Sequence, residues 1–271
     1  QRSTTAPAGF INSLLFTSSS AYSVLSSDSF VISQRVEGLN VADLGWGAAG
    51  ASSVTLSFWV RSSLTGTFGG ALQNSDRSRT YPFSYSISSA NTWEQKTITV
   101  SGDTTGTWIG ATNGVGMYVR FGVGVGSTYS GTAGAWAGAD YRSATGATSV
   151  VGTNGATFYI TGVQLEKGST ATSFDYRPYG TELRLAQRYF FKTGNPTNYS
   201  GATDGSGNTA LCVIFPTTMR SAPSVTNTRT GARSVDGFFV FPASSSTVST
   251  SLTYVFGAAQ DISVYGAAII Y

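Results

Sequence analysis

Histidine is absent from this chain, and other reactive residue types are scarce. Without histidine, the chain lacks the usual general base near neutral pH and the commonest zinc ligand. Its single cysteine, Cys212, excludes an intrachain disulfide. Because Cys212 lies in the apolar run 211–215, we expect it to be a small buried side chain rather than a reactive thiol.

Charged residues are also few, at 11% of the 271 residues, and the net charge of +3 is scattered along the chain. No run of Lys or Arg supplies the basic patch that nucleic-acid binding requires. No segment approaches the ~20 consecutive apolar residues of a membrane helix. Because 41% of the residues are hydrophobic, the chain can build real cores. We therefore expect a folded protein that neither binds nucleic acid nor inserts into a membrane.

The acidic residues form no recognisable catalytic motif. Glycan-cleaving enzymes use a pair of carboxylates. The loop acids in the first part of the chain are Asp76, Glu94, Asp103 and Asp140. Asp103 lies in a Gly-Asp-Thr turn, where its side chain is expected to bond to the nearby backbone. Since no nucleophile elbow, phosphate-binding loop or metal-spaced cluster is found either, we predict no catalytic residue and no enzyme.

What the sequence does contain is period-2 alternation of apolar and polar residues, which is typical of half-buried β-strands. The alternating segments are 30–36, 54–61, 81–87, 96–100, 115–123 and 158–165. Turn residues such as Asn113-Gly114 and Asn154-Gly155 separate them. Because no helical segment of ~10–15 residues lies between the strands, an antiparallel sandwich is favoured over a parallel α/β fold.

A short amphipathic segment, 181–189, is the best helix candidate, with Gly180 or Thr181 as its N-cap. A Gly/Asn/Ser-rich loop follows, and then strand candidates at 211–215, 224–228, 237–241, 252–256 and 262–270. We therefore predict an all-β chain in which a short helix joins two antiparallel sandwiches. The larger domain covers 1–180, the helical connector 181–192 and the smaller β domain 193–271.

Two long loops of the first domain, 39–53 and 122–150, carry aromatic residues. Loops of this length in a compact domain are usually functional or disordered, and the aromatic residues argue against disorder. Sugars present apolar C–H faces that stack on aromatic rings, so aromatic loop residues are candidates for glycan contact. The candidates are Trp46, Trp108, Tyr129, Trp136 and Tyr141. For each one, the alternative is a hydrophobic plug beneath a loop or a contact with a neighbouring subunit.

Three runs carry a family resemblance: VTLSFWVRSSLTGTFGGALQNS, ANTWEQKTITVSGDTTGTW and NGATFYITGVQLEKGSTATSFDYRPYGTEL. They resemble a jelly-roll module of tailed-phage tail and virion-appendage proteins. That module is in turn similar to the carbohydrate-binding jelly rolls attached to glycoside hydrolases. The resemblance covers about residues 1–190 and implies a jelly-roll topology. The family usually has one or two further strands before the position of Gln1, so the resemblance also implies a module that lacks its first strands.

Carbohydrate-binding jelly rolls often hold a structural calcium ion, and the resemblance implies where one would be held. Glu166 and Asp175 are the acids of the matching closing segment before the helix. Hard oxygen ligands of this kind suit calcium. In the alternative, both are surface acids that balance Lys167 and Arg177. No other cofactor is expected.

The remainder of the chain, with the marker FPTTMRSAPSVT, resembles the small C-terminal β domains of the same appendage proteins. In such proteins this region often lies at a trimer axis. A β domain of ~80 residues builds only a modest core alone, so we expect the chain to oligomerise, and the resemblance implies a homotrimer. The side chains expected to complete the core across the interface are Phe238, Phe239, Phe241, Tyr254 and Phe256.

The resemblance implies that the chain is a virion protein. Such a protein is assembled in the host cytoplasm with other virion proteins and becomes part of an extracellular particle. The first hypothesis is a tail-fibre or appendage component that binds a host-surface glycan. The second is a capsid decoration or connector protein with a purely structural role. A polysaccharide depolymerase is a weaker third hypothesis, because no catalytic pair is apparent.

Overall fold

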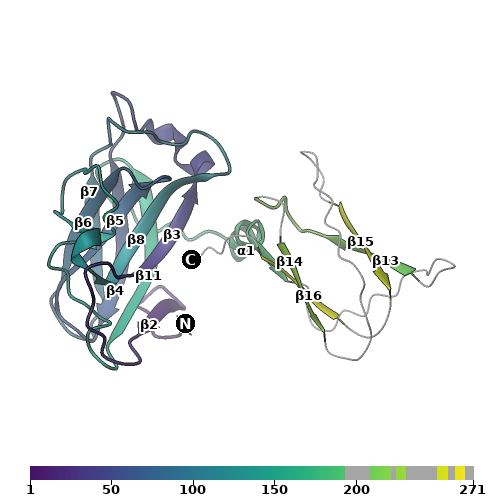
Figure 1. The fold of residues 1–271 in the computed structure, drawn as a ribbon, viewed down its shortest axis with the longest axis horizontal. Helices are drawn as coiled ribbons and strands as arrows, with labels where there is room; N and C mark the ends of the chain where they lie inside the picture. Colours follow the sequence, from purple (N-terminus) through teal and green to yellow (C-terminus); the bar gives the residue numbers. More distant parts are fainter. Residues whose placement is uncertain (193–207, 221–223, 230–248, 256–259, 266–271) are drawn as a thin grey trace. The chain divides into compact units, whose positions relative to one another are not determined.

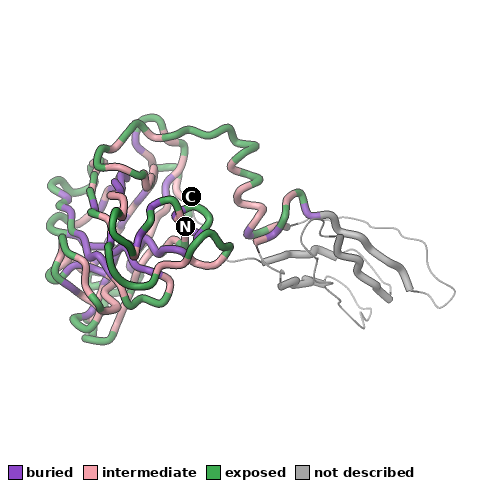
Figure 2. The backbone as a smooth tube through the Cα atoms, turned by 90° about the horizontal axis from the view of Figure 1, so that it is seen from above, coloured by how far each residue is buried: buried purple, intermediate pink, exposed green. Residues whose placement is uncertain are grey.

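The computed structural model describes residues 1–192, 208–220, 224–229, 249–255 and 260–265. It divides the chain into two compact units: the first begins at Gln1 and continues to Asp175, and the second begins at Tyr176. Within the first unit, buried positions follow the strands, whereas the connecting loops are largely exposed (Figure 2). The first unit thus has a core of its own.

The first unit is a sandwich of two antiparallel sheets (Figure 1). The first sheet has the order β1-β2-β11-β4-β7, and the second has the order β3-β8-β5-β6. The strands of the first sheet are β1 (Arg2–Ser3), β2 (Ser13–Thr17), β4 (Val54–Ser62), β7 (Glu94–Val100) and β11 (Thr157–Lys167). Those of the second sheet are β3 (Ser29–Glu37), β5 (Gly66–Asn74), β6 (Thr80–Ile87) and β8 (Val115–Val125).

The order of the strands is that of a jelly roll. From β2 to β8 the chain crosses repeatedly between the two sheets, and β11 returns to lie between β2 and β4. Two four-stranded antiparallel sheets connected in this way form the double Greek key of a jelly roll, with β1 as a short addition at one edge. The predicted all-β jelly-roll sandwich is therefore confirmed for the first unit.

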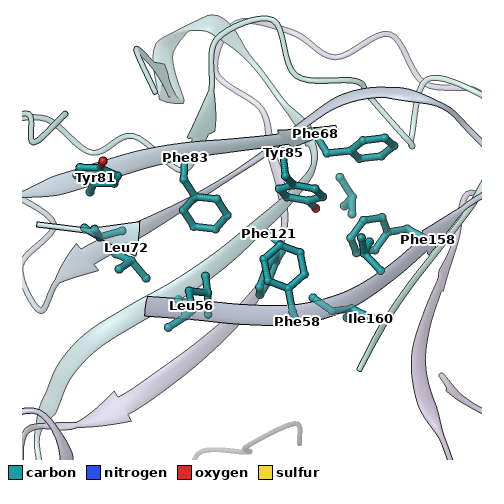
Figure 3. Close-up of a cluster of buried hydrophobic side chains, with 14 of the residues drawn as sticks. Leu56, Phe58, Phe68, Leu72, Tyr81, Phe83, Tyr85, Phe121, Phe158 and Ile160 are labelled. Atoms are coloured by element: carbon teal, nitrogen blue, oxygen red, sulfur yellow. The ribbon is translucent and has the colours of Figure 1, made fainter. Parts of the chain in front are cut away.

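The core lies between the two sheets and is rich in aromatic rings (Figure 3). Phe58 of the first sheet meets Tyr85 and Phe121 of the second, edge to face, with ring centroids 5.0 Å apart in both pairs. Such pairs add about 0.5–1.5 kcal/mol to the stabilisation from buried area. The core side chains occupy the apolar positions of the alternating segments 54–61, 81–87 and 115–123, as the period-2 pattern predicts.

The sequence pattern misses β5 (Gly66–Asn74), because glycines occupy positions where a strand usually carries β-branched or polar side chains. It also ends β8 too early. The strand continues to Val125, so the first residues of the expected loop 122–150 belong to the sheet. The expected loop therefore begins inside a strand and not after it.

The second unit begins with a short helix, α1 (Tyr179–Gln187), two residues earlier than predicted. Its N-cap residue is Pro178 and no side chain caps it, so the prediction that Gly180 or Thr181 is the N-cap is wrong. Both residues lie in the first turn instead. The part of the predicted connector at Phe190–Lys192 is a strand, β12.

The remaining strands of the second unit pair antiparallel in two small groups. One group has the order β12-β16-β14, and the other pairs β13 with β15. Their bounds are β13 (Asn208–Ile214), β14 (Ser224–Arg229), β15 (Ser249–Val255) and β16 (Gln260–Tyr265). The expected strand 237–241 lies outside the described residues, as do Phe238, Phe239, Phe241, Phe256 and the side chain of Tyr254.

Candidate functional site

The loop that follows β8, residues 126–150, folds back over the outer face of the second sheet, and we call it the cover loop. It contains a 3-10 turn at Ser127–Tyr129 and a short parallel pair, β9 (Ser130–Gly131) with β10 (Ser143–Ala144). The Gly134 N–H donates to the Pro82 carbonyl at 2.9 Å. Ala137 and Thr80 exchange backbone hydrogen bonds of 2.8 and 3.0 Å. The cover loop is therefore tied to β6.

Glycines in the sheet allow the cover loop to approach closely. A Cβ atom on Gly69 of β5 would lie 2.4 Å from Ser143 Oγ and 2.6 Å from Ala144 N. A Cβ atom on Gly122 of β8 would lie 2.6 Å from Ser143 Oγ. Because real Cβ atoms do not tolerate such distances, these two positions require glycine for the loop to stay in place.

Three of the predicted glycan-contact residues, Trp46, Trp108 and Trp136, form one cluster. Their ring centroids are 4.7, 5.2 and 5.7 Å apart, all edge to face. Trp46 is buried, and the other two are half-buried. Each indole N–H donates a hydrogen bond, to Ser52 O, Asp103 Oδ2 and Ser101 O respectively. This tryptophan cluster joins three loops, which agrees with the hydrophobic-plug alternative, and it leaves Trp108 and Trp136 partly accessible.

A partly buried ion pair, in which Asp103 is the buried partner, lies next to the tryptophan cluster. Arg79 donates to both carboxylate oxygens of Asp103, at 2.7 and 2.8 Å, and its guanidinium lies 6.0 Å from the Trp136 ring centroid. The Thr105 N–H also donates to Asp103, so the predicted turn-capping role is confirmed. Burial opposes ionisation of Asp103, but the bonds from Arg79, Thr105 and Trp108 outweigh it and lower the pKa. Asp103 thus stabilises the loop that carries Trp108.

A second polar group, which we call the Asp140 cluster, consists of Gln73, Arg77, Arg120, Asp140 and Arg142. Arg142 donates to both Asp140 oxygens, at 2.7 and 3.2 Å, and Gln73 Nε2 donates at 2.8 Å. The guanidinium nitrogens of Arg77 and Arg120 lie 3.8 and 4.0 Å from it. Burial opposes ionisation of Asp140, but the bonds from Arg142 and Gln73 lower its pKa overall. One carboxylate therefore faces three arginines.

Tyr129 and Tyr141, the other two predicted contact residues, lie beside the Asp140 cluster and are half-buried. The Arg142 guanidinium lies 3.8 Å from the Tyr129 ring centroid, within cation–π distance. The Tyr141 carbonyl accepts a hydrogen bond from Gln73, and its ring lies over Gly131. The five predicted residues thus form two groups, and the cover loop carries members of both.

The structure adds residues that the sequence interpretation did not select. Tyr118 and Arg120 of β8 lie on the outer face of the second sheet and are nevertheless buried. The Arg120 and Arg35 guanidinium groups lie 4.7 and 5.8 Å from the Tyr118 ring centroid. The alternation of 115–123 shows that Tyr118 and Arg120 point away from the core. Nothing in that pattern shows that a loop covers them.

The other two loop acids considered for catalysis, Asp76 and Glu94, stabilise local structure. Asp76 accepts hydrogen bonds from the Ser78 N–H and hydroxyl. Glu94 pairs with Lys96 at 2.6 Å and accepts from two backbone N–H groups. Together with Asp103 and Asp140, each of the four loop acids considered for catalysis therefore has a structural partner.

The two candidate calcium ligands have separate surroundings. Glu166 accepts hydrogen bonds from the Thr172 hydroxyl and N–H, and the Asp175 N–H donates to Gln164 Oε1. Lys167 pairs with Asp43 at 3.2 Å, and Arg177 pairs with Glu182 at 3.2 Å. Among the residues that the structure describes, no group of three or more acidic or cysteine side chains is arranged to hold a metal ion.

Within the described part of the chain, no helix has the length and apolar character needed to cross a bilayer. Comparisons of the chain with known family models and with curated proteins gave no match. What this protein binds must therefore be inferred from its jelly-roll fold and from the two groups of side chains beneath and beside the cover loop.

Proposed function

We propose that this chain is a non-enzymatic virion component that binds a host-surface glycan through the cover loop of its jelly-roll unit. The observation that carries the proposal is the combination of side chains on that loop. Tyr129, Trp136 and Tyr141 are half-buried rings, and arginine and amide groups lie beside them. Rings can stack on the apolar faces of a sugar, while guanidinium and amide groups can bond to its hydroxyls.

Placement of the protein on a phage particle rests on the resemblance of three sequence runs to tail-appendage modules. The jelly-roll topology of the first unit supports that assignment, because it is the fold that the resemblance implies. Many unrelated proteins share this fold, so the topology by itself does not fix a function. A tail-fibre or appendage component is the proposal that unites the fold, the resemblance and the aromatic cover loop.

A glycan array and binding to host lipopolysaccharide, both with the full-length chain, test the proposal. Loss of one stacking ring worth about 1.4 kcal/mol lowers affinity roughly tenfold. We expect this loss for Tyr129→Ala and Trp136→Ala. Tyr179→Ala on α1 is the matched control, because this ring is 79% exposed and lies outside the first unit. The proposal fails if the folded chain binds no glycan, or if all three variants bind equally.

A structural role as capsid decoration or connector protein is the second candidate, and exposed apolar residues favour it. Tyr22, Leu25 and Phe30 come from one short segment, and the Tyr22 and Phe30 ring centroids are 5.4 Å apart. Exposed apolar groups of this kind often mark protein interfaces. Electron microscopy of particles separates the candidates: density at the tail tip supports receptor contact, and density on the capsid lattice supports decoration.

A further inference from the structure

Arg120 is an outward-pointing residue of the second sheet that is only 7% exposed. In the strand register it lies between Ser33 of β3 and Ala71 of β5. Its neighbours along β8 on the same face are Tyr118 and Gly122. The guanidinium lies 4.7 Å from the centroid of the Tyr118 ring, and the Ser143 segment packs on Gly122, the neighbour on the other side.

The positive charge of Arg120 is poorly neutralised. The nearest carboxylate oxygen that pairs with it, on Asp140, is 4.0 Å away and is already bonded to other donors. Burial lowers the pKa of Arg120 to about 10; Asp140 opposes this shift, and the charges of Arg142 and Arg77 reinforce it. A buried cation with incomplete pairing is costly unless a further anion or hydrogen-bond acceptor reaches it.

Three buried polar atoms around this position have no hydrogen-bond partner among the described residues: Arg120 Nε, Gln73 Oε1 and Ser143 Oγ. Gln73 pairs with Tyr118, the neighbour of Arg120 on one side of β8, and Ser143 packs on Gly122, its neighbour on the other side. Gln73 is fully buried and Ser143 is 1% exposed. Buried polar atoms without partners need a physical explanation, and a bound molecule with both donors and acceptors is one.

On the side of β3, the residues beside this group of atoms are exposed to solvent. The cover loop is bonded to β6 and packs on β5 and β8, whereas Ser33 and Arg35 of β3 are exposed. Arg35 approaches the same Tyr118 ring as Arg120. A ligand that arrives along β3 therefore meets Arg35 first and Arg120 next.

We propose that Arg120 and Arg35 bind the carboxylate of an acidic sugar at the β3 margin of the cover loop. This inference rests on the proposed glycan binding and specifies the class of glycan. A guanidinium binds a planar carboxylate through paired hydrogen bonds. The sugar hydroxyls can donate to Gln73 Oε1 and Ser143 Oγ, which a bare anion without hydrogens cannot do. An acidic sugar thus combines the anion that Arg120 Nε lacks with the donors that Gln73 Oε1 and Ser143 Oγ lack.

The most direct test follows the Arg120 Nε–H signal in ¹H–¹⁵N spectra of the full chain, assigned by its loss in Arg120→Lys. Titration with glucuronate is expected to shift this signal in a saturable way. Methyl glucuronate ester, which keeps the hydroxyls and lacks the charge, is expected to shift it little. Inorganic phosphate and sulfate provide charge without the sugar, and we expect both to bind at least tenfold more weakly than glucuronate.

Variants test the same site through affinity for a uronic-acid polymer. We expect Arg120→Met to weaken binding at least tenfold and Arg35→Gln about threefold. Arg61→Gln is the matched control, because Arg61 also lies over a tyrosine ring, Tyr159 at 4.9 Å, but belongs to the first sheet and has its Nε bonded to Asn91 O. If Arg120→Met does not fold, Arg35→Gln and the Nε titration still decide the question.

The outcomes separate this inference from the proposed function. Equal binding of acidic and neutral glycans, with no effect of Arg120→Met or Arg35→Gln, overturns the inference and leaves glycan binding intact. Binding of phosphate as strong as that of glucuronate also overturns it. A saturable Nε shift with glucuronate, in a chain that binds no host glycan, supports the site and contradicts the proposed function.

Discussion

The ionised Asp103 side chain stabilises loops of the sandwich, because it accepts hydrogen bonds from Arg79, Thr105 and Trp108. Its pKa in the folded chain lies below the ordinary value of 3.8, so its ionised form stabilises the fold. That contribution is complete above the unfolded pKa and is lost as the pH falls through the folded pKa. We therefore expect the free energy of unfolding, measured by urea titration, to decrease as the pH is lowered below about 4.

The variant Asp103→Asn isolates this effect. It leaves Arg79 without its bidentate partner, so we expect a loss of about 3 kcal/mol at neutral pH and a weaker dependence on acid. Asp76→Asn is the control, since Asp76 is an exposed acid whose pKa is also lowered, by bonds from Ser78. We expect less than about 1 kcal/mol there. An unchanged acid slope in Asp103→Asn would contradict the assignment.

For Tyr85 we expect a substitution to increase the free energy of unfolding, not to decrease it. Its ring lies in the core against Phe58, and its hydroxyl is buried with no hydrogen-bond partner among the described residues. Burial raises the pKa of this hydroxyl, so it remains neutral at any ordinary pH. Because a buried unpaired hydroxyl costs about 1–3 kcal/mol, we expect Tyr85→Phe to raise the free energy of unfolding by about 1 kcal/mol.

Thermal and urea unfolding of Tyr85→Phe beside Tyr81→Phe provides the measurement. Tyr81 is the comparison because it occupies the same face of β6 and also packs against an aromatic ring, that of Trp136. Its hydroxyl is not among the buried atoms without a partner, so its removal is expected not to stabilise the chain. A loss of stability in Tyr85→Phe would show that the hydroxyl has a partner, such as a buried water.

Single residues also show where sequence interpretation succeeds and where it ends. The role of Asp103 follows from the Gly-Asp-Thr turn, because the side chain bonds to backbone two residues away. The role proposed for Arg120 depends on Asp140 and Ser143, which are distant in sequence and reach the sheet only after the cover loop has folded. Local patterns encode the first kind of contact and not the second.

At the level of elements, the packing of β5 against the cover loop gives a sharp prediction. A methyl group on Gly69 would lie 2.4 Å from Ser143 Oγ and 2.6 Å from Ala144 N, so Gly69→Ala is expected to push the loop away from the sheet. Hydrogen exchange should become faster at the Thr145 and Thr148 N–H groups, which bond to Gly131 O and Thr67 O. Exchange in the core strands should change little.

Gly138→Ala is the matched control, because Gly138 lies in the same loop and an added Cβ atom would have its nearest neighbour 4.0 Å away. Equal exchange in the two variants would show that the loop does not depend on the close approach at Gly69. If the proposed acidic-sugar site is correct, Gly69→Ala also displaces Ser143 and weakens binding of glucuronate.

The same element explains why β5 is absent from the sequence prediction. Period-2 alternation identifies β4, β6 and β8, where each strand has large apolar side chains on one face. In β5, Gly69 is glycine because the cover loop lies against it, and Gly70 because Phe83 and the Arg120 carbonyl do. Tertiary contacts thus require glycine at positions where the period-2 pattern of a strand would otherwise show a side chain. The helix α1 is identified from its local pattern, with an error of two residues at each end.

At the scale of the whole molecule, the division after Asp175 leaves every strand of the jelly roll and its core in the first unit. A sandwich of this size buries enough apolar surface to fold alone. We therefore expect a fragment of residues 1–175 to unfold cooperatively, with a midpoint close to that of the first transition of the full chain. Circular dichroism and calorimetry of both proteins provide the measurement.

Sedimentation of the same two proteins tests the proposed trimer. A β domain of ~80 residues, as predicted for 193–271, builds only a modest core alone, so association is expected to depend on it. At micromolar concentration, the full chain should sediment with the mass of three chains and the 1–175 fragment with the mass of one. A trimeric fragment would place the contacts in the jelly roll, with exposed Leu25 and Phe30 as the first residues to replace. A monomeric full chain would remove the trimer and, with it, the multivalency that strengthens weak glycan contacts on a host surface.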